Sequence, residues 1–176
     1  MTLMKTRLLL APLFTVAVLA AAVIATPAAE AATKACPASG LVVSAAPEGG
    51  GGAAGSFYYR IWFTNLSSST CTLSGFPTVS AVSLKGKRIG AAANHSPGVK
   101  MKAVKLDQGD TATAQLRVVN ALIYSPNECK PAWAAGLRVG IPGSSATKVA
   151  PLAFQTCALT STRILSVQAV TPLVGP

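Results

Sequence analysis

Residues 56–79 read SFYYRIWFTNLSSSTCTLSGFPTV, and this stretch carries the signals that decide the fold. Its first half alternates, so that one face should enter a core and carries Phe57, Tyr59, Ile61 and Phe63. The opposite face carries Tyr58, Arg60, Trp62 and Thr64. A serine tract, a cysteine and a Gly-Phe-Pro turn follow directly. The stretch therefore predicts a half-buried strand that ends at a corner.

The corner itself allows two interpretations. Asn65-Leu66-Ser67 matches the acceptor pattern for N-linked glycans. Alternatively, Asn65 and the serines bond the local backbone where the strand ends, as short polar side chains do in turns. In that second interpretation Cys71 pins the corner to the first strand, and Gly75 and Pro77 turn the chain into the next one.

Further short runs of strand-forming residues follow, separated by turn signals and without a long helical pattern. Two of them alternate clearly, and their inward faces should carry Ala112, Ala114, Leu116 and Val118 in one run and Leu137, Val139 and Ile141 in the other. Strands are expected at 41–46, 57–66, 78–84, 88–92, 100–106, 111–119, 136–142, 152–159 and 164–170. This spacing predicts an all-β protein, an antiparallel immunoglobulin-like β-sandwich of about 7–9 short strands.

The N-terminal segment is read as a targeting signal rather than as part of the fold. Lys5 and Arg7 precede an apolar run at 8–25, and Ala29-Glu30-Ala31 is a small-x-small cleavage pattern. We expect a secretory signal peptide at 1–31 and a single β-sandwich domain at 32–176, with no transmembrane segment after cleavage. The alternative is an uncleaved N-terminal anchor.

Export changes how the four cysteines are interpreted. Cys36, Cys71, Cys129 and Cys157 all follow the signal, and an even count in an oxidising compartment predicts two disulfides. Four cysteines allow three pairings. We favour the local pairing, Cys36–Cys71 and Cys129–Cys157, because each bond would join neighbouring segments. No C-x-x-C pair is present for a zinc or redox motif.

Charge provides the main functional lead. The 176-residue chain has 15 Lys and Arg against 5 Asp and Glu, a formal net charge of +10. An exported protein this basic is attracted to anionic polymers or lipid surfaces, although simple solubility is an alternative explanation. The cations cluster in two neighbouring segments that would form one edge patch if they paired: Lys85, Lys87, Arg88, Lys100, Lys102 and Lys105. Lysines also protect edge strands against aggregation, so this cluster has a structural explanation too.

Catalytic, metal and nucleic-acid chemistry find little support. His95 is the only histidine, lies in a Pro/Gly-flanked loop, and no G-x-S-x-G motif is present. Asp107 and Asp110 follow it at a spacing that leaves a dyad conceivable. The carboxylates, which include Glu48 and Glu128, look like turn residues. The basic segments lack the interleaved aromatics of a single-strand nucleic-acid platform. We expect no enzyme activity, no cofactor and no specific nucleic-acid partner.

Several of these motifs resemble a known family. The segments FTNLSSSTCTLSGFPTVSAV, KLDQGDTATAQL and NECKPA are similar to the secreted actinobacterial domain-of-unknown-function family numbered 4232. The matching positions are Asn65, Cys71, Leu73, Gly75, Phe76, Pro77, Val79, Leu106, Gly109, Ala112, Cys129 and Cys157. The resemblance implies a secreted β-sandwich with two disulfides and no established activity, and a bacterial family argues against a glycan on Asn65. Many relatives carry a lipid-attachment signal or a long linker, and neither is recognisable here.

Three functional hypotheses follow from the sequence. The first is a secreted, extracellular or cell-wall-associated binding module whose basic face meets an anionic envelope polymer or lipid. The second is a protein-interaction or inhibitor module for an unknown secreted protein, for which an exposed aromatic patch with Tyr58 and Trp62 would be evidence. The third is a hydrolase that uses His95.

Overall fold

The computed structural model describes residues 34–49, 52 and 55–173. The predicted signal at 1–31 lies outside the described residues. Among the elements described, no helix has the length and hydrophobicity that crossing a bilayer requires. The helical segments are short: η1 (Ala38–Gly40), η2 (Ala121–Ile123) and α1 (Pro126–Cys129).

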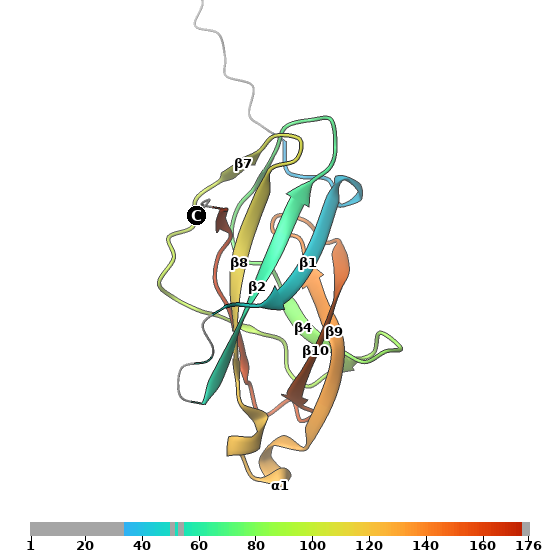
Figure 1. Cartoon of the computed structure of the whole chain (residues 1–176), viewed down its shortest axis with the longest axis vertical. Coiled ribbons are helices and arrows are strands. Elements are labelled where there is room, and N and C mark those ends of the chain that lie inside the picture. Colours follow the sequence, from blue (N-terminus) through green and yellow to red (C-terminus); the bar gives the residue numbers. More distant parts are fainter. Residues whose placement is uncertain (1–33, 50–51, 53–54, 174–176) are drawn as a thin grey trace, which may run out of the picture. The chain divides into compact units, whose positions relative to one another are not determined.

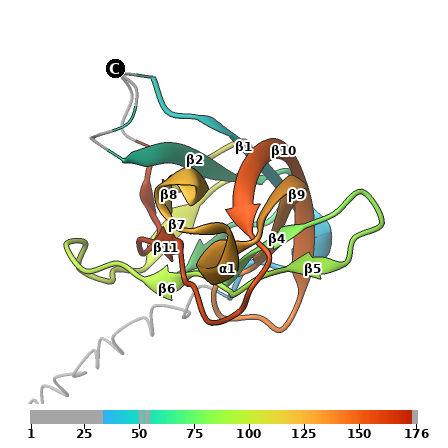
Figure 2. The ribbon, with the colours of Figure 1, turned by 90° about the horizontal axis from the view of Figure 1, so that it is seen from below.

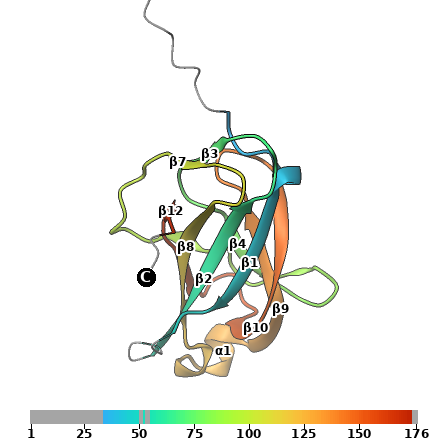
Figure 3. The same cartoon turned by 45° about the horizontal axis from the view of Figure 1, so that its top comes forward.

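Two larger sheets form the two layers of a sandwich (Figure 1 and Figure 3). The first has the order β1 (Leu41–Pro47), β2 (Ser56–Asn65), β8 (Thr111–Val119), β11 (Leu165–Val167) and β6 (Asn94–His95), and β12 (Thr171–Pro172) also pairs with β8. The second has the order β10 (Thr147–Cys157), β9 (Pro131–Gly140), β4 (Val79–Val82) and β5 (Arg88–Ile89). A third, two-stranded sheet joins β3 (Cys71–Leu73) to β7 (Val104–Leu106).

The all-β sandwich class is therefore confirmed, and the pairing between the named strands is antiparallel except between β11 and β6. The described residues form twelve strands rather than 7–9. The excess comes from strands of two or three residues, which are too short to show an alternating pattern. One of them, β6, falls in a segment that the sequence predicted as loop, and it pairs with β11 in the tertiary structure.

Side chains between the layers follow the predicted alternation closely. On β8 the four inward residues at 112, 114, 116 and 118 are all buried, and on β2 Ile61 and Phe63 are fully buried. Phe57 was expected to enter the core, but 48% of it is exposed. Its side chain lines a surface hollow together with Tyr59 and Phe154, so the face was predicted correctly but this position lies at the open end of the sandwich.

The favoured disulfide pairing is confirmed. Cys36 bonds to Cys71 and Cys129 bonds to Cys157, and no cysteine of the described chain is free. The first bond lies near β7 at one end of the sheets, and the second lies by α1 at the other end (Figure 1). Each bond joins a segment outside the larger sheets to a strand, which fastens both ends of the sandwich.

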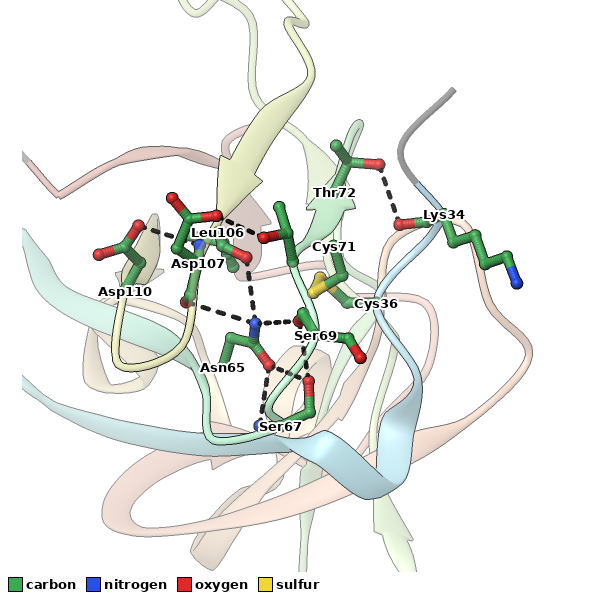
Figure 4. The surroundings of a disulfide bond; sticks show 11 residues. Lys34, Cys36, Asn65, Ser67, Ser69, Cys71, Thr72, Leu106, Asp107 and Asp110 are labelled. Atoms are coloured by element: carbon green, nitrogen blue, oxygen red, sulfur yellow. Dashed lines mark hydrogen bonds between the residues drawn. A yellow bond between two sulfur atoms is a disulfide. The ribbon is translucent and has the colours of Figure 1, made fainter. Parts of the chain in front are cut away.

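The corner after β2 is organised by the side chain of Asn65, which is fully buried (Figure 4). Its Oδ1 accepts hydrogen bonds from the backbone N–H and the hydroxyl of Ser67 at 3.0 and 2.7 Å. Its Nδ2 donates to the carbonyl oxygens of Ser69 and Leu106, each at 3.0 Å, and of Asp107 at 3.3 Å. The backbone-bonding interpretation is therefore confirmed, and a buried amide engaged in this way is no glycan acceptor.

We predict that Asn65→Ala destabilises the domain by about 2–3 kcal/mol, because it removes the donor that satisfies backbone carbonyls in a buried place. Chemical denaturation followed by fluorescence measures the free energy of unfolding. Ser68→Ala is the matched control, since Ser68 is an exposed neighbour in the same tract. Equal stability of the two variants would contradict the role given to Asn65.

Candidate functional site

The six predicted patch cations fall into two separate groups. Lys85, Lys87 and Arg88 belong to the β4–β5 hairpin, where Ala81 pairs with Ile89 and Val82 with Arg88. Lys105 lies on β7, which pairs with β3, whereas Lys100 and Lys102 lie outside any strand. The hairpin is confirmed, but the exposed strand expected at 100–106 is reduced to 104–106.

The pairing that would have joined the two groups does not occur. β5 is the edge strand of the sheet that contains β4, and β7 is held in another sheet by β3. The hairpin tip at 83–87 and the segment at 96–103 extend from different sides of the domain in Figure 1 and Figure 3. A single edge of six cations is therefore not formed, and the hairpin group, Lys85, Lys87 and Arg88, is considered by itself.

The hairpin tip is held in place by its own turn and by a neighbouring strand. The N–H of Ser83 donates to the carbonyl of Lys87 at 2.9 Å, and the N–H of Gly86 donates to the carbonyl of Ser83 at 2.8 Å. From β9, Nη2 of Arg138 donates to the Gly86 carbonyl at 2.7 Å. Leu84 and the two lysines therefore extend from a braced loop.

The strand after the tip is also fixed against β10. Gly90 has φ +65°, and a Cβ at this position would lie 2.0 Å from the carbonyl oxygen of Cys157. Only glycine permits this close approach. Because Cys157 is bonded to Cys129, the hairpin rests on a segment that the second disulfide fastens.

An apolar hollow of about 520 Å³ lies beside the hairpin tip. Its walls are the side chains of Leu84, Lys85 and Trp133 together with small residues, Ser83, Ala134, Ala135 and Ala153. Leu84 is 95% exposed and Trp133 is 69% exposed. The neighbouring alanines are too small to cover the indole of Trp133. One wall of the hollow is therefore a large apolar side chain that is mostly exposed to solvent.

A second hollow, of about 230 Å³, adjoins the first and shares Trp133 and Ala153 with it. It is lined by Phe57, Tyr59, Phe154, Asn120, Ala121 and Gln155. The residues after Ala121 in η2, Leu122 and Ile123, are 63% and 61% exposed. We call the exposed apolar residues of this region the Trp133 surface, and its members are Phe57, Leu84, Leu122, Ile123 and Trp133.

The Trp133 surface was not found from the sequence. Trp133 lies in a turn-rich stretch that was predicted to be irregular, and Phe57 was placed in the core. The one available signal was Leu84, an apolar residue inside the lysine-containing hairpin turn. Tyr58 and Trp62, which the sequence suggested as an aromatic patch, are half-buried on the outer face of β2.

His95 lies in β6 and stacks on Phe76, with ring centroids 4.1 Å apart and planes 7° apart. The next residue in the chain toward the N-terminus, Asn94, accepts a hydrogen bond from Arg163 at 3.4 Å. In the described part of the chain no hydrogen bond links His95 to Asp107 or Asp110. The dyad that the sequence left open is therefore not assembled here.

The carboxylates of the described chain have structural partners. Oδ1 of Asp107 accepts from the Thr70 hydroxyl at 2.6 Å, and this bond together with the nearby Lys105 charge lowers the pKa of Asp107. Oδ2 of Asp110 accepts from the backbone N–H of Asp107 at 3.0 Å.

The other two carboxylates are equally engaged. Hydrogen bonds from the side chain and backbone of Ser125 lower the pKa of Glu128, which closes the first turn of α1. Partial burial raises the pKa of Glu48, but Arg60 and Gln115, which both donate to this carboxylate, bring it below its usual value.

Metal binding is not supported by the arrangement of these side chains. Within residues 34–49, 52 and 55–173 no three His, Cys, Asp or Glu residues gather closely enough to hold an ion. The chemistry that the Trp133 surface offers is contact with apolar groups, with cationic side chains at its edge.

Comparison with known proteins gives one finding. A family described as a domain of unknown function (DUF4232) matches residues 36–171, from the first disulfide cysteine to the start of β12. No curated protein matches the chain.

The lowered pKa of Glu48 generates a prediction about acid stability. A carboxylate whose folded pKa is depressed stabilises the fold above its unfolded pKa, and this contribution disappears as the pH falls through the folded pKa. We expect the melting temperature to fall between about pH 5 and about pH 3, and to fall less in Glu48→Gln because the substituted amide does not titrate. Thermal melts across this range measure the difference, and parallel curves for the two proteins would contradict it.

Proposed function

The chain belongs to the family described as a domain of unknown function (DUF4232), and we propose that it is an exported, non-enzymatic binding module. It acts at or near the cell envelope, and the cations of the β4–β5 hairpin bind an anionic polymer or lipid surface. The two disulfides and the predicted signal at 1–31 support export, because disulfides persist in oxidising compartments.

The observation that carries this proposal is the hairpin's uncompensated charge. The ion pairs of the described residues join Arg60 to Glu48 and Lys105 to Asp107. Lys85, Lys87 and Arg88 take part in neither pair and are exposed. Charges that are fixed on a braced loop and not neutralised within the protein remain available to an external anion.

The non-enzymatic part of the proposal is supported by the engagement of the candidate catalytic groups. Each carboxylate of the described chain accepts a hydrogen bond that closes a turn, caps a helix or connects strands. The His95 ring stacks on Phe76. A hydrolase based on His95 is the competing hypothesis, and an envelope-polymer hydrolysis that is lost in His95→Ala would establish it.

A second candidate function, a protein-interaction or inhibitor module, is favoured by the exposure of Trp133. Exposed aromatic residues beside apolar hollows are common anchors in protein interfaces. The two functions differ in their response to salt. Ionic contacts with a polymer weaken as salt rises, whereas an interface centred on an indole persists.

The separation of the cations into two groups gives a direct test. We predict that a variant with Lys85→Gln, Lys87→Gln and Arg88→Gln elutes from isolated cell-wall material or anionic polymer at clearly lower salt than the unmodified protein. The measurement is the salt concentration needed for half elution.

The matched control is Lys100→Gln, Lys102→Gln and Lys105→Gln, which removes the same charge from the other group. If both variants shift elution equally, general basicity explains retention and the hairpin is not a binding site. If neither shifts it, the cations serve solubility alone and the proposed function is wrong.

A further inference from the structure

We propose that the Trp133 surface docks onto an anionic lipid membrane, with its apolar side chains inserted at the headgroup level and the hairpin cations in contact with lipid phosphates. This inference rests on the proposed function, because it names the partner that the hairpin cations meet. It adds a second contact, apolar insertion, that a purely ionic polymer interaction does not require.

The apolar members come from four segments, which are the start of β2, the β4–β5 hairpin, η2 and the start of β9. Figure 2 looks onto the end of the sandwich that carries α1, and it shows α1 near the centre with the hairpin tip between β4 and β5 extending to one side. The two hollows that share Trp133 connect Leu84 to Phe57. Leu84, Trp133 and Phe57 therefore lie along two adjoining hollows, and Leu122 and Ile123 follow Ala121, which lines the second of them.

Cations border this surface, and the carboxylates near it, Glu128 and Glu48, are bonded within the protein, Glu48 to Arg60 and Gln115. Lys85 adjoins Leu84 in the chain and lines the same hollow, and Lys130 ends α1, which lies at this end (Figure 1). Glu128 is the one described carboxylate in α1, and it is bonded to Ser125. The carboxylates at 107 and 110 follow β7 at the other end of the sheets (Figure 1).

The shape of the surface favours a lipid over a folded partner. Leu84 is 95% exposed at the tip of a projecting hairpin, so its side chain borders the open hollow beside Trp133 and remains accessible to solvent. Leu122 and Ile123 in η2 are also mostly exposed. Protruding leucine and tryptophan side chains next to lysines are the combination that peripheral proteins place at the interface of anionic membranes.

The Trp133 surface is also held in a fixed conformation in the protein without bound lipid. The Arg138–Gly86 hydrogen bond and the approach of Gly90 to Cys157 fix the hairpin. The Cys129–Cys157 disulfide fastens α1 to the end of β10. Docking therefore orders few residues, which lowers the entropic cost of association.

The test uses residues 32–176, which contain the complete described core and exclude the apolar run at 8–25. Sedimentation is measured with vesicles of phosphatidylcholine containing phosphatidylglycerol and with vesicles of phosphatidylcholine alone. We expect binding to the anionic vesicles, and a blue shift of the Trp133 emission upon binding as the indole leaves water.

Leu84→Ser should weaken binding to the anionic vesicles by about tenfold or more, because insertion of a leucine side chain is lost. Because Leu84 is exposed, its replacement should not affect folding. An equal melting temperature of the variant and the unmodified protein verifies this. Trp133→Ser should abolish the emission shift, since the chain's other tryptophan, Trp62, is on the outer face of β2. Met101→Ser, at a position 64% exposed in the segment on another side of the domain, is the matched control and should bind normally.

Three outcomes would overturn the inference. Vesicle binding that is equal in Leu84→Ser and Met101→Ser would show that no apolar insertion occurs. Salt-sensitive retention on wall polymer without vesicle binding would reject the lipid while leaving the proposed function standing. Capture of a secreted protein that is lost in Leu84→Ser, again without vesicle binding, would assign the Trp133 surface to a protein partner.

Discussion

The buried side chain of Asn65 closes one end of the sandwich, and the layout of the domain depends on it. It links the end of β2, the serine tract and the chain between β7 and β8. The backbone of the same residue bonds to Gly109 and Asp110. Asn65 therefore both shapes its own turn and connects that turn to a segment more than 40 residues away in the sequence. The Cys36–Cys71 bond joins the chain beside this hydrogen-bonded corner. Exposed apolar side chains occur at several places, Leu66 beside Asn65 among them, and Trp133 is exposed toward the other end, where the Cys129–Cys157 bond and α1 hold the chain without covering it.

The features that sequence predicted well are those whose cause lies within a few residues. Alternation placed β8 correctly because every inward side chain there meets the facing sheet. The disulfides were predicted because bonds between neighbouring segments cost least chain entropy to close. The strand at 100–106 was overestimated and β6 was missed because both depend on a partner from elsewhere, β3 in one case and β11 in the other. Alternation of apolar and polar residues shows which face of a strand can be buried. It contains no information about which other strand will pair with that strand.

The candidate site shows the same division between local and long-range information. Lys85, Lys87 and Arg88 stay together because four consecutive positions of one hairpin hold them. Their expected joining with Lys100 and Lys102 required two segments to pair, and the disulfide corner instead directs β7 to β3. The Trp133 surface required knowledge of where the layers end. Phe57 has the inward orientation that alternation predicts, yet it remains exposed because it lies where the sandwich opens.

The hairpin lysines can keep the protein soluble and can also bind an anion, and the same exposed position of their side chains serves both roles. Lysines beside Leu84 oppose association of one exposed edge with another, and they do so whether or not a ligand exists. A purely solubilising group, however, gives no reason for a leucine that is 95% exposed at the tip of the same hairpin, or for an exposed indole next to it. If solubility were the sole requirement, polar residues at these two positions would serve it better than an exposed leucine and an exposed tryptophan. Their position, on a braced loop beside a hollow that an exposed indole lines, is the arrangement on which we base the proposed binding surface.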